Sequence, residues 1–333
     1  MLDLSTKYMG LNLRSPLVVS ANPLSQKIEN ILAMEDAGAG AVVLFSLFEE
    51  QIRAEAAKIE KVQRSTVNIF AEMTGFFPNL DDEYPVGTAQ YLELIREAKS
   101  RTEIPIIASL NGVTPEGWIE YAREIEQAGA DGLEINVYFI PADIRLKPDD
   151  VEKRYLEIVK MVRETIDIPI AVKLNPYFSS IGNMAHELCL AGADALVLFN
   201  RFYQPDFDVN ELKVVPNLNL SHPSEIRLPL LWIAVLFGRI PASLAATTGV
   251  HGARELIKYL LAGADVGMVA SSLLQNGIPW IKDILDDLEL YLLDMEFKSV
   301  DSFKGIMSQL HVPDPTAYER SNYIQIIENK DWR

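Results

Sequence analysis

This sequence of 333 residues contains one cysteine and four histidines, and its 30 basic residues are outnumbered by 47 acidic ones. Its one cysteine, Cys189, has no second thiol for a disulfide or an iron–sulfur cluster, so we expect an intracellular, cytoplasmic protein. The four histidines show no metal-ligand spacing, which predicts no metal site. The net charge of −17 argues against nucleic acid or an anionic membrane as partner. No apolar run is long enough to predict a membrane span or an N-terminal signal peptide.

A short motif, Ala-Gly-Ala usually followed by Asp, occurs four times, each time between a predicted helix and a hydrophobic segment. Its copies start at Ala37, Ala128, Ala191 and Ala262. Each step leaves room for about two strand–helix units of roughly 30 residues. The glycine suits a left-handed residue at the end of each helix. Four steps therefore predict eight strands and eight helices, which close into a (β/α)8 TIM barrel.

Eight short aliphatic runs fit the strands of this barrel. Most are apolar throughout, as expected for parallel strands that are buried on both faces. They are residues 16–20, 41–46, 104–110, 133–138, 168–174, 195–200, 243–248 and 266–271. Pro115 and Pro148 each mark the first turn of a helix. The whole chain, 1–333, is predicted to be one α/β domain with its chemistry at the C-terminal ends of the strands.

Two connections are long for a compact domain, 47–90 after the second strand and 201–227 after the sixth. The first contains an aromatic stretch at 76–80, and the second has short extended pieces around 218–220. Both leave the catalytic end of the barrel, so we expect functional loops. The tail 297–333 is predicted to pack outside the barrel or across its mouth.

The ends of the predicted strands carry most of the candidate functional residues. Lys173 lies in an apolar run, where a lysine must reach the barrel mouth or be costly to bury. We predict that it touches a ligand; the structural alternative is a buried ion pair, with Glu134 as a candidate partner. Segments 247–249 and 270–271 end the last two strands, where barrels usually bind phosphate through backbone N–H groups. Tight packing at a turn is the alternative there.

Taken together, these segments resemble the dihydroorotate dehydrogenases, the FMN-dependent barrel enzymes of pyrimidine synthesis, most closely class 1. The resemblance runs from Leu4 to about Asp294. It is carried in order by residues 12–23, 134–137, 172–177, 247–250 and 262–264. It implies an FMN-dependent dehydrogenase that acts on a CH–CH bond of dihydroorotate or a related small molecule, and it implies a homodimer.

The resemblance also implies residue roles. Flavin-binding positions would be Ser20, Ala21, Ser46, Ser109, Asn111, Asn136, Lys173, Thr248, Gly249, Ala270 and Ser271. The last four of these would hold the FMN phosphate. Lys173 would lie at the N1–C2 carbonyl edge of the ring, where a cation stabilises reduced flavin. Asn136 and Asn200 would contact the substrate.

The chain departs from the family in the loop after the fourth strand. Phe139 stands in place of the family's Cys or Ser base, and it cannot accept a proton. Pro141 replaces a substrate-binding Asn, and Phe45 replaces a flavin-contacting Lys. We consider Tyr138 as a substitute base. The alternative is that its ring only stacks near the flavin.

Several functions therefore stay open at this point. The first is dihydroorotate oxidation, and the second is a flavoprotein with a less polar substrate, suggested by the aromatic residues near the mouth. A Schiff-base aldolase with Lys173 as nucleophile is the third. The fourth is a catalytically degenerate relative that acts as a partner or sensor.

Overall fold

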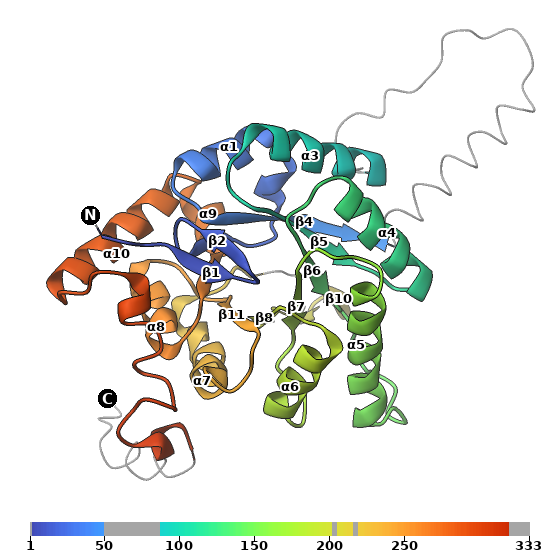
Figure 1. The fold of residues 1–333 in the computed structure, drawn as a ribbon. Coiled ribbons are helices and arrows are strands. Elements are labelled where there is room, and N and C mark those ends of the chain that lie inside the picture. The colour runs from blue at the N-terminus through green and yellow to red at the C-terminus, as the bar shows by residue number, and fades with distance from the viewer. Residues whose placement is uncertain (1, 50–86, 202–204, 216–218, 320–333) are drawn as a thin grey trace, which may run out of the picture.

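A computed structural model describes residues 2–49, 87–201, 205–215 and 219–319 of the chain. Eight parallel strands form a closed barrel, and helices cover its outside (Figure 1). In pairing order the strands are β3 (Leu17–Val19), β4 (Ala41–Phe48), β5 (Ile106–Asn111), β6 (Gly132–Asn136), β7 (Ile170–Leu174), β8 (Ala195–Leu198), β11 (Ser243–Ala246) and β12 (Val266–Val269). Each end lies within two residues of the predicted run, so the prediction of a (β/α)8 barrel is confirmed.

Helices flank the barrel, and two of them begin at the predicted prolines, Pro115 and Pro148. The flanking helices are α1 (Ile28–Asp36), α3 (Thr88–Arg101), α4 (Pro115–Gln127), α5 (Pro148–Arg163), α6 (Ile181–Ala191), α7 (Arg227–Leu236), α8 (Ala253–Ala262), α9 (Ser271–Asn276) and α10 (Trp280–Asp294). Short 3-10 turns lie at Pro23–Gln26, Pro223–Ile226, Val300–Ser302 and Pro315–Tyr318. The Thr114 hydroxyl accepts a hydrogen bond from the Gly117 N–H at 3.1 Å and so caps α4. The glycines of the four Ala-Gly-Ala motifs have φ between 95° and 115°, as predicted for helix ends.

Side chains of the barrel strands alternate between two apolar clusters. Along β7, Ile170, Val172 and Leu174 pack in the outer cluster beneath the helices, and Ala171 packs in the inner cluster. This alternation gives the next inward position on β7 to Lys173. The barrel strands are therefore buried on both faces, and a polar side chain on the inner face lies inside the barrel.

A hairpin that the sequence analysis did not predict closes the N-terminal end of the barrel. It pairs β1 (Thr6–Tyr8) with β2 (Leu11–Leu13). Tyr8 and Met9 are at most 1% exposed and belong to the inner cluster. The Met9 N–H donates to the Ser243 hydroxyl at 3.0 Å, at the first residue of β11. Access to the interior is therefore left to the opposite end, where the strands finish.

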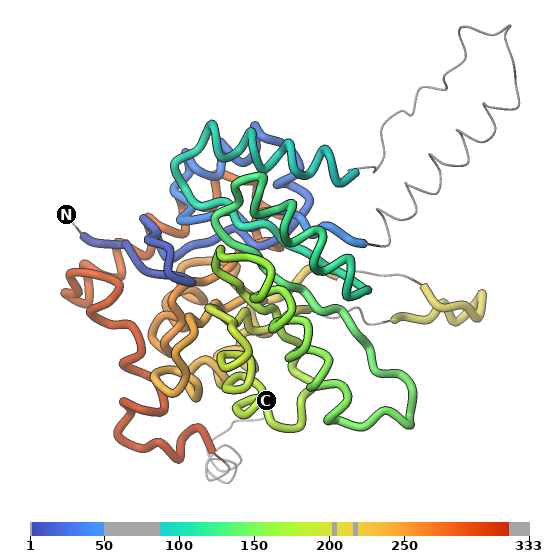
Figure 2. The backbone as a smooth tube through the Cα atoms, turned by 45° about the vertical axis from the view of Figure 1, so that its right-hand side comes forward, coloured from blue at the N-terminus to red at the C-terminus, as the bar shows by residue number. Residues whose placement is uncertain are grey.

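In the loop after β8, the short strands lie earlier in the sequence than predicted. Of the extended pieces expected around 218–220, residue 218 lies outside the described residues, and residues 219 and 220 lie in no strand. Instead β9 (Asp206–Asp208) pairs antiparallel with β10 (Lys213–Val215). Figure 2 shows this hairpin, in yellow, projecting away from the barrel.

Residues 305–309 run along the outside of the barrel, against α7 and α8. Backbone N–H groups of Gly305 and Met307 donate to carbonyls at the end of α8, and the N–H of Gln309 donates to Ala234 in α7. The long predicted loop 47–90, with its aromatic stretch at 76–80, falls mostly outside the described residues. Within the described ranges, no helix combines the length and apolarity needed to cross a bilayer.

Candidate active site

The inner face of the barrel changes from apolar to polar toward the strand ends. Register places Ser109 of β5 beside Glu134 of β6, and Asn136 of β6 beside Lys173 of β7. All four side chains are buried. Because successive inward residues are two apart, Glu134 and Asn136 lie on the same face of β6. The strand ends thus form a polar layer above the apolar interior.

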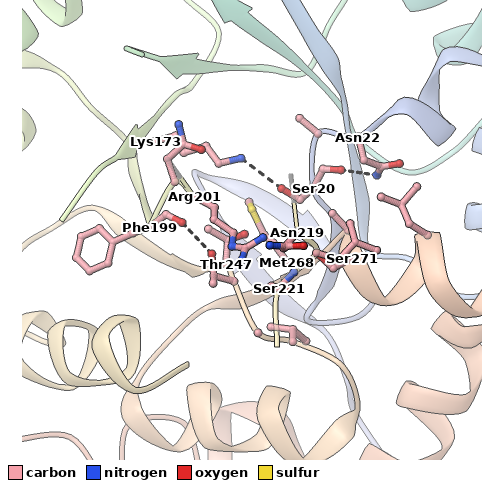
Figure 3. A pocket seen from close by; sticks show the side chains of 18 of the residues that line it. Ser20, Asn22, Lys173, Phe199, Arg201, Asn219, Ser221, Thr247, Met268 and Ser271 are labelled. Carbon is pink, nitrogen blue, oxygen red and sulfur yellow. Dashed lines mark hydrogen bonds between the residues drawn. The ribbon is translucent and has the colours of Figure 1, made fainter. Parts of the chain in front are cut away.

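Lys173 is held in this layer by two contacts. Its Nζ lies 3.3 Å from Glu134 Oε1. The same atom lies 3.4 Å from the Ser20 hydroxyl (Figure 3). The lysine side chain is 9% exposed, and Glu134 is 0% exposed. Glu134 Oε2 is also buried and has no partner among the described residues. The predicted ion pair is therefore present, and Lys173 also lines a pocket.

A pocket of about 240 Å³ opens above the polar layer. It brings together eight of the predicted site residues, namely Ser20, Ala21, Lys173, Asn200, Thr248, Gly249, Ala270 and Ser271. These residues come from both ends of the sequence and meet because strands β3, β7, β8, β11 and β12 finish at the same edge. The pocket is therefore a single site at the C-terminal end of the barrel.

The end of this pocket near β11 and β12 is lined mostly by small residues. Thr248 and Gly249 both have φ of 77°, and the Thr248 hydroxyl donates to the Phe199 carbonyl at 3.1 Å. A Cβ at position 249 would lie 2.7 Å from Ile226 Cγ2, so only glycine fits the turn. Ser271 begins α9 rather than ending a strand as predicted, and its hydroxyl accepts from the Ser221 N–H at 3.1 Å. Small residues that follow β11 and β12 therefore line this end of the pocket.

The model of the dihydroorotate dehydrogenase family matches residues 3–292. The chain belongs to the dihydroorotate dehydrogenase family. A Thermoplasma acidophilum relative, named dihydroorotate dehydrogenase B (NAD(+)) catalytic subunit, is 25% identical over 92% of this chain and 99% of its own length. The PreA subunit of NAD-dependent dihydropyrimidine dehydrogenase from Escherichia coli K12 is 23% identical over 93% of this chain and 78% of its own. The chain is therefore a member of an oxidoreductase family.

Other positions that the family resemblance assigned lie beside the pocket rather than in its wall. The Asn200 amide donates to Asn136 Oδ1 at 2.8 Å, which ties two predicted substrate residues together. Ser46 and Ser109 hydroxyls are 2.9 Å apart, and Ser109 Oγ lies 3.5 Å from Glu134 Oε1. Asn111, two residues beyond Ser109 on β5, is 5% exposed. Ser46 and Ser109 thus support the polar layer.

The loop that departs from the family lines a second, apolar pocket. This pocket has a volume of about 370 Å³ and is lined by Phe139, Ile140, Pro141, Val151, Asn175, Tyr177, Phe178 and Pro205. The Arg154 guanidinium lies 4.3 Å from the centroid of the Phe139 ring. Tyr138 is 38% exposed and lines neither of these two pockets. Phe45, expected at the mouth, packs against the ring of Tyr91 instead, with centroids 5.0 Å apart.

Buried hydroxyls fix the strand ends that flank this loop. The Asn175 amide donates to the Tyr155 hydroxyl at 2.8 Å, and that hydroxyl donates to the Val137 carbonyl at 3.0 Å. Burial raises the pKa of Tyr155 to about 12, so it stays a proton donor at neutral pH. The ends of β6 and β7 are therefore tied to α5.

Some pocket residues were missed by the sequence analysis. Arg201 follows the predicted Asn200 directly, lines the pocket and pairs with Glu225 at 3.1 Å. A second cation next to a predicted ligand residue was the available signal. Ser221 also lines the pocket, and its hydroxyl lies 3.1 Å from His251 Nε2. No local pattern marks that residue, because its partners lie 30 and 50 residues away.

Proposed function

We propose that this protein is an FMN-dependent oxidoreductase that takes a hydride from a CH–CH bond of dihydroorotate or a related small substrate. The observation that carries the proposal is the position of Lys173, buried at the floor of a pocket whose other end is lined by the backbone turn at Gly249. A cation at one end and small residues at the other suit a flavin with its phosphate. When bound, FMN supplies the hydride acceptor.

The residues present fit such a cofactor. Thr248, Gly249, Ala270 and Ser271 would hold the phosphate, since these small residues line one end of the pocket and let the backbone approach an anion closely. Lys173 would place its ammonium at the ring edge that gains negative charge on reduction. The Ser20 and Ala21 backbone would meet the ring from β3. In the same proposal, Ser46, Ser109 and Asn111 support this layer.

Substrate recognition would fall to the two linked amides. The Asn200 amide donates to Asn136 Oδ1 at 2.8 Å, and this hydrogen bond fixes the orientation of both side-chain amides. Amide side chains both donate and accept, which suits the alternating N–H and C=O groups of a pyrimidine-like ring. We include in the proposal that these residues orient the substrate over the cofactor.

Proton removal is the step for which this chain is least equipped. Phe139 carries no basic group, and its ring packs under Arg154 in the apolar pocket. General base catalysis is worth about 10²–10⁴ in rate, so dihydroorotate oxidation should be slower by that factor. Tyr138 stays the candidate substitute base.

The first test is whether the purified protein carries flavin and whether dihydroorotate bleaches it without oxygen. We expect FMN to be released by heat, and flavin reduction to be slow in the natural protein. The substitutions Phe139→Cys and Phe139→Ser should raise the reduction rate by about 10²–10⁴. Phe178→Cys, in the same pocket but away from the base position, is the matched control and should not.

One outcome would contradict the cofactor assignment, and another would contradict the argument about the base. A protein that neither holds nor takes up FMN would refute the cofactor assignment. Reduction by dihydroorotate at an ordinary enzymatic rate of about 1–10³ s⁻¹ would instead confirm the substrate and refute the need for a base at position 139. Sedimentation of the same preparation tests the proposed homodimer.

A less polar substrate is the second candidate. It is favoured by the apolar pocket around Phe139, Ile140 and Phe178, which shares the ends of β6 and β7 with the polar layer. In this version the substrate carries an apolar group that enters that pocket. A screen in which no apolar small molecule perturbs the flavin spectrum would refute it.

A further inference from the structure

Glu134 is a carboxylate buried in the barrel interior beneath the pocket floor. It is 0% exposed, its Oε1 lies 3.3 Å from Lys173 Nζ, and its Oε2 has no partner within the described residues. Burial of two charges is expensive, and a well-packed apolar pair of similar volume is often at least as stable. Stability alone therefore does not account for this pair.

One consequence of this ion pair is that it controls the position of the lysine side chain. Lysine has a flexible four-carbon stem with a compact charge at its tip. Here the tip is held on one side by Glu134 of β6 and on the other by Ser20, next to β3 across the barrel. Glu134 is itself approached by the Ser109 hydroxyl, which contacts Ser46. This line of side chains fixes the ammonium at the floor of the pocket.

The pair also changes the charge that a ligand meets. A free ammonium at the floor would present one full positive charge to the pocket. A carboxylate at 3.3 Å cancels part of that charge, and its effect is strong because neither group faces bulk water. The field in the pocket is therefore that of an oriented ion pair.

We propose that Glu134 is a positioning residue that fixes the Lys173 ammonium and weakens its positive charge, and thereby lowers the reduction potential of the bound flavin. The proposal rests on the proposed FMN site. Two-electron reduction adds negative charge at the ring edge, so a weaker cation favours the oxidised flavin. Glu134 acts only through Lys173 in this proposal and does not touch the substrate.

The test is the midpoint potential of the flavin in the loaded protein. Glu134→Gln keeps the size of the side chain and an oxygen for Lys173, but removes the charge. We expect the ratio of affinities for reduced and oxidised flavin to rise at least tenfold, which is about 30 mV for a two-electron couple. Glu157→Gln, at an exposed ion pair on α5, is the matched control and should leave the potential unchanged.

The outcomes separate this inference from the function on which it rests. Wild-type protein without flavin would overturn both. Wild-type protein with flavin, and a Glu134→Gln variant whose affinity ratio changes less than twofold or falls, would overturn this inference alone. A purely structural role would lower the stability of that variant without moving the potential.

A second variant keeps the test decisive should Glu134→Gln fail to fold. Glu134→Asp retains the charge but withdraws the carboxylate from Lys173 by one methylene. Its affinity ratio should rise at least twofold, and no rise would overturn the proposal.

Discussion

Removal of the lysine of the buried pair is the sharpest test of how the polar layer is held together. Lys173→Met keeps an unbranched side chain of similar length and deletes the charge. It leaves the Glu134 carboxylate 0% exposed with neither oxygen in an ion pair. The fold then has to keep an uncompensated charge inside the barrel.

The expected cost follows from the distance and the burial. Two unit charges 3.3 Å apart attract by about 5 kcal/mol at an effective dielectric constant of about 20. Breaking a buried pair by removing one partner typically costs about 3–5 kcal/mol, because the remaining charge stays desolvated. We therefore expect Lys173→Met to lower the free energy of unfolding by about 3–5 kcal/mol. Adding Glu134→Gln to it should restore about 1–3 kcal/mol of that loss, as expected for side chains in direct contact.

The measurement is urea unfolding of flavin-free protein, followed by tryptophan fluorescence, because a bound ligand would add its own stabilisation. Lys282→Met is the control: Lys282 lies 2.7 Å from Asp286, closer than the buried pair, but both side chains are mostly exposed. Its removal should leave unfolding nearly unchanged. A loss below about 1 kcal/mol for Lys173→Met, or a double variant no more stable than the single one, would refute the reasoning.

Three further substitutions or reactions follow from local geometry. Gly249→Ala forces a Cβ against Ile226 at positive φ, so it should weaken FMN binding and lower the free energy of unfolding by at least about 1–2 kcal/mol. Gly182→Ala, which has open space in helix α6, is the control and should leave stability unchanged or raise it. Equal effects of the two substitutions would contradict this. Burial raises the pKa of the Cys189 thiol, so less thiolate forms near pH 8 and iodoacetamide should label native protein more slowly than urea-unfolded protein; equal rates would be the contrary result. Tyr91→Phe removes the buried hydroxyl that accepts from the Ser109 N–H at 2.9 Å and should cost about 1–3 kcal/mol in urea unfolding, and no loss would mean that this N–H finds another acceptor.

The sequence predicted the barrel because its signals are local and repeated. The four Ala-Gly-Ala motifs set the period, and an apolar run buried on both faces needs no knowledge of its partners. Lys173 stood out for the same reason, since a charge inside such a run must have a specific partner or ligand. These features depend on burial and backbone conformation, which a short stretch of sequence determines.

The position of Ser46 shows what the sequence could not reveal. Strict alternation along β4 from the inward Val43 would turn Phe45 into the barrel and Ser46 out of it. Instead the register with β5 shifts between Val43 and Ser46, so that Ser46 pairs with Ser109. Phe45 then packs against Tyr91, on the side of the helices. A bulge depends on the neighbouring strand, which no local pattern describes.

The separation of the two pockets bears on what a missing base means for this protein. Lys173 is fixed by strand register and by contacts from β3 and β6, and none of these involves the loop that carries Phe139. Phe139 lines a different pocket, under Arg154. A change in that loop can therefore alter the substrate or the proton acceptor without disturbing the residues proposed to hold the cofactor. Under the proposed function, a phenylalanine at the position expected for the base thus argues for altered substrate chemistry more than for loss of flavin binding.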